Sequence, residues 1–219
     1  MGDVHEQVLH AAKEMLRRGL TAGTSGNVSG RLPDDRVVIT PSSLPYEDMT
    51  LDDLVVLDLD GNVVDGHRSA SSEKWVHLAC YRKFDEVGSV IHTHPLYATM
   101  FACARQPIPA VVDEFTLYVG GEVPVCDYAM SGTTELGDNA AAMLDDVGSA
   151  LLASHGMVTV GPSTERALHQ AGVVERAAQI VWGARSLGGA VPLPDKVNRD
   201  FINVYKLLFR KPQNEAGNA

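Results

Sequence analysis

Three pairs of short apolar runs in the chain are each joined by only a few turn-forming residues. VSGRL and RVVIT flank residues 33–35, LVVLDL and NVV flank residues 60–62, and SALLASHG leads directly into MVTVG. Strands joined by such short turns pair antiparallel, because a parallel connection needs about a dozen residues or more. The sequence therefore predicts a mainly antiparallel sheet.

Helical patterns separate and flank these runs. Apolar residues at helical spacing predict helices at about 4–18, 73–84, 96–104, 132–146, 163–188 and 197–210. Further strands are expected at VGSVIHTH (87–94) and near VPVCD (123–127). No repeat or low-complexity linker divides the chain. We therefore predict a single α/β domain over residues 1–211, with a central, mainly antiparallel sheet flanked by helices, and a frayed tail at 212–219.

Composition and charge argue against several classes of partner. The chain has 219 residues and a formal net charge of −10. Nucleic-acid binding is not expected, because phosphate backbones need clustered Lys and Arg. The sequence shows neither a membrane-spanning apolar run nor a secretory-signal pattern. Its three cysteines are far apart and form no CxxC motif, so we expect reduced thiols and a cytoplasmic location.

Histidines at strand ends predict a metal site. His92 and His94 face the same way on a strand, with Cα atoms about 6.6 Å apart at a rise of about 3.3 Å per residue. His155 also follows an apolar strand, and Glu73 opens a helix after a serine-rich loop. Together they form a plausible zinc set. Such a zinc could be a catalytic Lewis acid or a closed structural ion, and the histidines could also be ordinary polar residues.

The other histidines carry weaker signals. Residue 67 lies in a loop with no obvious partner, and four more occur in helical stretches, where we expect surface or core-edge positions. These four are His5, His10, His77 and His169.

Three loops rich in glycine and hydroxyl side chains suit a phosphate group. They cover residues 23–27, 40–43 and 69–72, and a helix begins after the last one. Backbone N–H groups, hydroxyls and the helix dipole could hold a phosphate without Lys or Arg, although each loop alone could be an ordinary turn. GTSGN is neither a Walker loop nor a nucleophile elbow, and residues 58–61 (DLDG) are interpreted as a hairpin turn rather than a calcium loop.

The motifs GTSGN, TPSS, SSE, HTH and SHG, in this order and spacing, resemble those of the zinc-dependent class II sugar-phosphate aldolases, and among them L-fuculose-1-phosphate aldolase. The resemblance extends from the first helix to about residue 210. It implies one α/β domain, a zinc ion and a cyclic homotetramer with active sites at subunit interfaces. The same family includes epimerases, dehydratases and the non-catalytic adducin head domain.

The resemblance also implies roles for individual residues. Zinc would be held by His92, His94, His155 and Glu73, and Glu73 would leave the metal to move the proton beside the carbonyl of dihydroxyacetone phosphate. Ser43 stands where the family usually has glycine. The substrate phosphate would lie among Thr24, Gly26, Asn27, Ser42, Ser43, Ser71 and Ser72.

The chain departs from the family pattern on the aldehyde side. Asp113, followed by Glu114, stands where a tyrosine of the neighbouring subunit is thought to protonate the aldehyde-derived oxygen. Ser131 and Phe209 replace an aromatic residue and a C-terminal tyrosine. Either acid could donate the proton if burial raises its pKa. The alternatives are an interface salt bridge at these acids and Tyr118 as the donor.

The resulting hypothesis is an aldolase of carbohydrate metabolism. It would reversibly cleave a ketose 1-phosphate, such as L-fuculose 1-phosphate or a 5-deoxypentulose 1-phosphate, to dihydroxyacetone phosphate and a short aldehyde. Alternatives with the same fold are an epimerase, dehydratase or decarboxylase acting on a related sugar phosphate or acid, and an adducin-like binding module. The chain is short for a metallohydrolase barrel, which needs about 250 residues.

Overall fold

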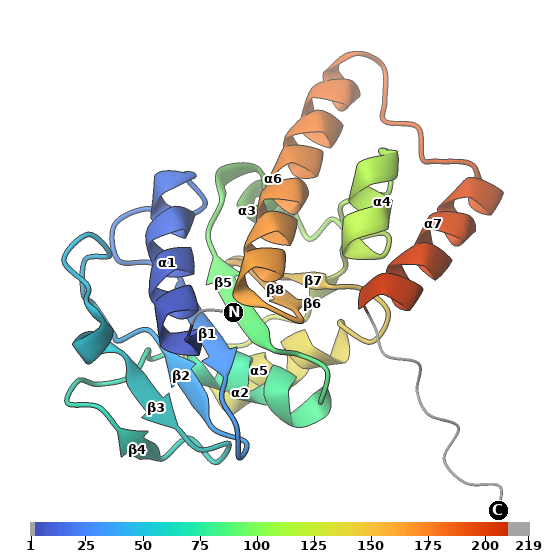
Figure 1. Ribbon diagram of the computed structural model, residues 1–219. Helices are drawn as coiled ribbons and strands as arrows, with labels where there is room; N and C mark the ends of the chain where they lie inside the picture. The colour runs from blue at the N-terminus through green and yellow to red at the C-terminus, as the bar shows by residue number, and fades with distance from the viewer. Residues whose placement is uncertain (1–2, 210–219) are drawn as a thin grey trace, which may run out of the picture.

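The computed structural model describes residues 3–209, whose strands form one eight-stranded sheet in the order β4-β3-β2-β1-β5-β8-β7-β6 (Figure 1). Every neighbouring pair is antiparallel except β6 and β7, which confirms the predicted sheet. The predicted tail at 212–219 lies outside the described residues. The strands are β1 (Asn27–Arg31), β2 (Val37–Ile39), β3 (Val55–Leu57), β4 (Val63–Asp65), β5 (Ser89–Thr93), β6 (Val125–Cys126), β7 (Ser149–Leu152) and β8 (Gly156–Gly161).

Local turn chemistry closes the predicted hairpins. Asp34 and Asp35 both adopt positive φ, at 60° and 55°, between β1 and β2. Between β3 and β4, the Asp58 carboxylate accepts a hydrogen bond from the Asn62 backbone N–H at 2.8 Å. The DLDG segment is therefore a hairpin turn, as predicted, and Asp58 is engaged in closing it.

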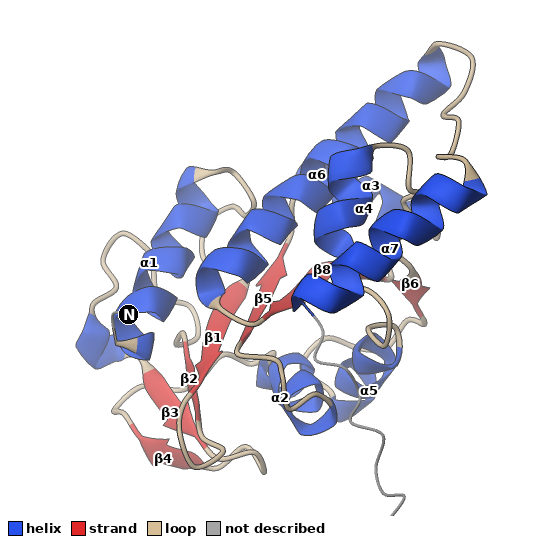
Figure 2. Cartoon of the chain, turned by 45° about the vertical axis from the view of Figure 1, so that its right-hand side comes forward, coloured by secondary structure: helices blue, strands red, loops and turns tan. Residues whose placement is uncertain are grey.

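Helices cover both faces of the sheet, with α2 and α5 on one face and the other helices on the opposite face (Figure 2). They are α1 (Val4–Arg17), α2 (Lys74–Lys83), α3 (Leu96–Ala104), α4 (Asp113–Val119), α5 (Thr134–Ala142), α6 (Thr164–Ser186) and α7 (Asp195–Phe209), and a 3₁₀ turn, η1, spans Leu51–Asp53. The sequence did not predict α4, because seven residues show too little of the helical period. No helix within residues 3–209 is long and apolar enough to cross a membrane.

Strand alternation decides which polar side chains face which helices. Val90 of β5 belongs to the apolar cluster with α2 and α5, whereas Ile91 belongs to the cluster on the opposite face. His92 therefore points to the same side as Val90. Asn27 and Ser29 of β1 are the cross-strand partners of His92 and Val90, so they also face α2.

Candidate metal centre

Four side chains predicted as metal ligands meet at one end of β5 and β8. Glu73, His92, His94 and His155 each offer a ligand atom, and these atoms all lie within 4.8 Å of one another. His92 belongs to β5 and His94 follows it, His155 lies in the turn between β7 and β8, and Glu73 is the N-cap of α2. The structure thus brings together residues from three separate parts of the chain.

The three imidazoles form a compact propeller. Their ring centroids are 4.7, 4.8 and 4.8 Å apart, with interplanar angles of 67–70°. His92 Nε2 lies 2.8 Å from His94 Nε2 and 3.0 Å from Glu73 Oε2, and His155 Nε2 lies 3.1 Å from Glu73 Oε1. Three nitrogens and a carboxylate at such short separations match the donor set of a tetrahedral zinc site.

The donor chemistry fits a cation. His92 Nδ1 lies 2.8 Å from the Met157 carbonyl oxygen, which can only accept, so Nδ1 carries the hydrogen. In a neutral ring Nε2 then has a lone pair, and this lone pair faces the Glu73 carboxylate and His94 Nε2. Acceptors that face each other need a positive charge between them, either a proton or a metal ion. The carbonyl behind His92 is also the kind of partner that orients metal-binding histidines.

The electrostatics keep the ligand atoms in their metal-binding forms. Burial, with smaller contributions from His92 and His155, lowers the pKa of His94 to about 4. Burial alone would raise the pKa of Glu73, but the adjacent His155 and His92 rings outweigh it and hold that pKa well below its usual range. A neutral imidazole and an ionised carboxylate are the states that bind a metal ion.

Glycines in two of the motifs allow the backbone to pack closely around these ligands. A Cβ on Gly156 would lie 2.5 Å from the Thr93 carbonyl oxygen and 2.6 Å from His94 Cδ2. A Cβ on Gly26, whose φ is +79°, would lie 2.8 Å from the His92 carbonyl oxygen. Gly156 of SHG and Gly26 of GTSGN are therefore required by the packing beside the imidazoles.

Glu175 of α6 holds the turn that follows His94, and the sequence patterns did not identify it. Pro95 caps α3 without a side-chain hydrogen bond. Glu175 supplies one from a distance, because its two oxygens accept from the N–H groups of Tyr97 and Ala98 at 2.9 and 2.8 Å. A carboxylate at a helix N-terminus satisfies free N–H groups and complements the helix dipole. Nothing in the local sequence around Glu175 indicates this contact.

Beside Glu73, the predicted phosphate loops 40–43 and 69–72 are hydrogen-bonded to each other, and Thr40 is bonded to Val28, the residue after loop 23–27. The Thr40 N–H donates to Val28 O at 3.0 Å, Ser71 N–H to Thr40 O at 3.2 Å, and Ser42 N–H to Ser69 O at 3.0 Å. Four of the predicted phosphate ligands are exposed, one is half-buried and two are buried. The exposed ones are Thr24, Ser42, Ser43 and Ser72. Gly26 is half-buried, and Asn27 and Ser71 are buried.

Asn27 and His77 have partners that the sequence reading missed. Asn27 Nδ2 lies 3.3 Å from Glu73 Oε2, and the amide oxygen of Asn27 contacts His77 Nε2. His77 is completely buried, so the predicted surface or core-edge position is wrong. Burial, with a further contribution from His92, lowers the pKa of His77 to about 3. The spacing of Glu73, His77 and Tyr81 at every fourth residue would have indicated one helix face.

The predicted aldehyde-side residues lie apart from the metal cluster in this chain. Asp113 and Glu114 are exposed on the first turn of α4, and neither forms an ion pair within residues 3–209. The Tyr118 ring packs edge-on against His169, at a centroid distance of 4.7 Å. Their roles in catalysis stay predictions.

The two replaced aromatic positions differ in setting. Phe209 stacks on the guanidinium of Arg166, whose Cζ lies 3.7 Å from the ring centroid. Ser131 is exposed in the loop before α5.

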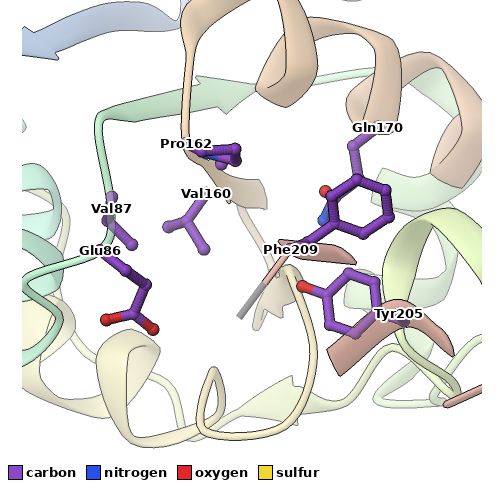
Figure 3. A pocket seen from close by; sticks show the side chains of 8 residues that line it. Glu86, Val87, Val160, Pro162, Gln170, Tyr205 and Phe209 are labelled. Carbon is purple, nitrogen blue, oxygen red and sulfur yellow. The ribbon is translucent and has the colours of Figure 1, made fainter. Parts of the chain in front are cut away.

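A small hollow lies at the other end of β8 (Figure 3). Ser89 pairs with Gly161 at this end and Thr93 pairs with Met157 at the metal end. The two places are four residue steps apart along the strand, or about 13 Å at a rise of about 3.3 Å per residue. The hollow therefore does not belong to the metal centre. It is lined by Glu86, Val87, Val160, Gly161, Pro162, Gln170, Tyr205 and Phe209.

Comparison with known proteins places this site in a family. The family described as class II aldolase and adducin N-terminal domain matches residues 6–182. A 5-deoxy-D-ribulose 1-phosphate aldolase of Bacillus thuringiensis serovar kurstaki is 35% identical over 191 residues, covering 87% of this chain and 89% of the relative. An L-ribulose-5-phosphate 4-epimerase of Salmonella paratyphi B is also 35% identical, covering 92% of this chain and 95% of the relative.

The solved structures agree with the sequence relatives. An L-fuculose 1-phosphate aldolase superposes with a TM-score of 0.89 at 35% identity, covering 94% of this chain and 97% of the other. The range matched by the family, residues 6–182, includes the positions of the four clustered side chains. The chain belongs to the family of class II aldolase and adducin N-terminal domains.

Proposed function

We propose that this protein is a zinc-dependent aldolase that reversibly cleaves a ketose 1-phosphate to dihydroxyacetone phosphate and a short aldehyde. L-fuculose 1-phosphate and a 5-deoxypentulose 1-phosphate are the leading substrates. The observation that carries the proposal is the cluster of Glu73, His92, His94 and His155 within 4.8 Å, next to hydroxyl-rich loops of which 40–43 and 69–72 are hydrogen-bonded to each other. The names of relatives at 34–35% identity support it, since they include aldolases of two such sugar phosphates.

The residues of the cluster fit a zinc ion. His92, His94 and His155 would hold it together with Glu73, and when bound it would supply Lewis acidity to polarise the substrate carbonyl. The loops around residues 24–27, 42–43 and 71–72 would bind the phosphate through N–H and hydroxyl donors. Because these donors are mostly uncharged, phosphate binding is compatible with a chain of net charge −10.

Glu73 would move the proton. In the direction of condensation its carboxylate takes a proton from the hydroxymethyl carbon beside the carbonyl of dihydroxyacetone phosphate. That carbon then attacks the aldehyde carbonyl, and the aldehyde oxygen takes up a proton. We assign this second proton to Asp113 or Glu114 of a neighbouring subunit, since neither acid joins the metal cluster within one chain.

The assignment requires a homo-oligomer, and we propose the cyclic homotetramer that the family resemblance implies. Large apolar side chains are exposed close to the cluster: Leu96 follows His94 and Pro95, and Tyr128 and Met130 lie in the loop that packs on Ser72 through Gly132. Such side chains favour contact with another subunit. Light scattering on protein eluting from a size-exclusion column tests the oligomeric state. A monomer with full activity would contradict the proposed homotetramer.

A condensation assay on metal-free protein tests the proposed reaction. Dihydroxyacetone phosphate is offered with lactaldehyde, acetaldehyde and glycolaldehyde before and after removal of metal by a chelator, and after zinc is returned. We expect one or more aldehydes to react, the rate to vanish on metal removal, and zinc to restore it. Condensation that persists without metal would overturn the proposal.

The second candidate function is a 4-epimerase. The 35% identity to an L-ribulose-5-phosphate 4-epimerase, over 92% of the chain, favours it. Incubation with L-ribulose 5-phosphate separates the two candidates, because an epimerase forms the 4-epimer of this compound and an aldolase specific for ketose 1-phosphates does not.

We also propose a cytoplasmic enzyme whose catalytic domain spans residues 1–211. Cys80 and Cys126 are buried and Cys103 is exposed, and none of the three forms a disulfide within residues 3–209. An exposed free thiol suits a reducing compartment. Fractionation of the native cells tests the location, and limited proteolysis tests the domain boundary.

A further inference from the structure

A line of buried polar groups runs from Glu73 into the layer between α2 and β1. Asn27 Nδ2 lies 3.3 Å from Glu73 Oε2, and Asn27 Oδ1 contacts His77 Nε2. His77 Nδ1 lies 2.6 Å from Ser29 Oγ, which lies 2.8 Å from the Tyr81 hydroxyl. Asn27, Ser29, His77 and Tyr81 are at most 3% exposed, so they must satisfy one another's hydrogen bonds. We call these five residues the buried chain.

The secondary structure presents the members of the buried chain in register. Asn27 and Ser29 are two residues apart on β1, so both point toward α2. Glu73, His77 and Tyr81 follow one another at every fourth residue and line one face of α2 from its N-cap. The two elements therefore interleave their polar side chains over the length of the contact.

The direction of each hydrogen bond follows from the carboxylate at one end. An ionised Glu73 only accepts, so Asn27 turns its amide nitrogen toward Glu73 and its oxygen toward His77. The amide oxygen also only accepts, so His77 Nε2 carries the ring hydrogen. Nδ1 of the neutral ring then accepts from Ser29 Oγ, which in turn accepts from Tyr81.

A competing acceptor does not change this order. Ser29 Oγ lies 3.5 Å from the Val90 carbonyl oxygen, against 2.6 Å from His77 Nδ1, and the shorter contact takes the hydrogen. Complete burial also keeps the His77 ring neutral, because a charged ring there would lack water and would have no carboxylate in contact.

We infer that His77 is a positioning residue of the metal centre: its Nε2–H holds the Asn27 amide in the one orientation that offers an N–H to Glu73. Without that donor the amide can turn over and place its oxygen against the carboxylate, which displaces Glu73 from the imidazoles. The inference rests on the proposed role of Glu73 as a ligand and base. It assigns to His77 an effect on metal affinity although His77 is not in the ligand cluster.

The first measurement reads the His77 tautomer directly. A long-range ¹H–¹⁵N spectrum of histidine-labelled wild-type protein shows which ring nitrogen of each histidine carries the hydrogen, and the signals missing from His77→Gln identify His77. We expect the neutral Nε2–H form. The Nδ1–H form would reverse the direction of the hydrogen bonds that His77 makes to Asn27 and Ser29, and would overturn the inference.

The second measurement compares zinc affinity across four variants by competition with a coloured chelator. His77→Leu removes the donor and is expected to weaken zinc binding about 10–100-fold, the usual cost of losing an outer partner of a metal ligand. His77→Gln keeps an N–H donor, so its zinc affinity should fall less. Tyr81→Phe removes only the hydroxyl at the far end of the buried chain, so its zinc affinity should fall least.

Leu78→Ala is the control for destabilisation alone. Leu78 lies on the same helix, is fully buried and belongs to the apolar cluster below the sheet. It should lower the melting temperature and leave zinc affinity unchanged. Equal zinc affinities in His77→Leu and Tyr81→Phe, or equal losses in His77→Leu and His77→Gln, would overturn the inference.

These readouts separate the inference from the proposed function. A wild-type protein that binds no zinc would refute the proposed function. In that case the Nε2–H tautomer would still support the buried chain and the Nδ1–H tautomer would still overturn it.

Discussion

The acid predicted for the metal side of the site and the two acids predicted for the aldehyde side lie in opposite environments. Glu73 is largely buried at the N-cap of α2, where it contacts two imidazoles and the Asn27 amide. Asp113 and Glu114 are exposed on α4 and have no ion pair among residues 3–209. The comparison teaches that one chain by itself brings the four predicted metal ligands together. Within residues 3–209, the predicted aldehyde-side acids do not join this cluster.

The largest expected effect comes from Glu73→Gln. If Glu73 moves the proton, the variant loses both condensation and the exchange of deuterium from D₂O into dihydroxyacetone phosphate without aldehyde. The loss should reach about 10²–10⁴-fold, the usual contribution of a general base. NMR follows the exchange. Full exchange in Glu73→Gln would remove Glu73 from the proton transfer.

Asp113→Asn and Glu114→Gln test the other half in the same assay. Replacing the acid that donates the proton to the aldehyde oxygen should lower the condensation rate about 10²-fold. The rate of deuterium exchange should stay at the wild-type value. If both variants condense normally but the oligomer dissociates, the two acids are interface salt-bridge residues and the donor lies elsewhere.

Gly156→Ala tests whether close packing holds His94 in place. The new Cβ would collide with the Thr93 carbonyl and the His94 ring. We expect a loss of about 1–3 kcal/mol in the free energy of unfolding, together with weaker zinc binding. Gly172→Ala is the matched control, since a Cβ there meets nothing within 4 Å. Urea titrations of both variants check the difference, and equal stabilities would show that the loop yields without cost.

The buried side of the site should also set part of the acid sensitivity. The pKa of His77 is about 3 in the folded protein and about 6.5 when unfolded, so acid protonates the unfolded chain first. The contribution of the neutral His77 ring to the free energy of unfolding is complete above pH 6.5 and is lost as the pH falls toward 3. The slope approaches about 1.4 kcal/mol per pH unit in this window.

Urea midpoints at pH 7 and pH 5 measure this contribution. The decrease between the two pH values should be larger for wild type than for His77→Gln, which has no ring to protonate. Equal decreases would mean that His77 does not contribute.

The smallest expected effect is that of Glu175→Ala, which removes the distant cap of α3. Loss of a cap costs about 1 kcal/mol of unfolding free energy. Hydrogen exchange at the Tyr97 and Ala98 amides should increase, because these two N–H groups lose their acceptor. Unchanged protection of both amides would show that α3 does not depend on Glu175.

Much of the fold and the ligand set could be predicted from short-range patterns. The hairpins and the long α6 follow from turn residues and helical spacing. Ser163, where the helix was expected to begin, is the N-cap of α6, and its hydroxyl accepts from the Arg166 N–H. The seven residues of α4 could not be predicted, since so short a helix depends on its packing. His77 was misplaced because its neighbours in space, Asn27 and Ser29, lie 50 and 48 residues away.

The sequence by itself determined the sheet, the flanking helices and the identity of the four clustered side chains. Each of these depends on residues close together in the chain or on motifs readable in order. Only the tertiary structure decided that three imidazoles cluster with the Glu73 carboxylate, that Glu175 caps α3, and that the buried chain ends on Glu73. Hydrogen-bond direction and burial depend on which distant segments share an interior, and the pairing of β1 with β5 over α2 establishes that contact.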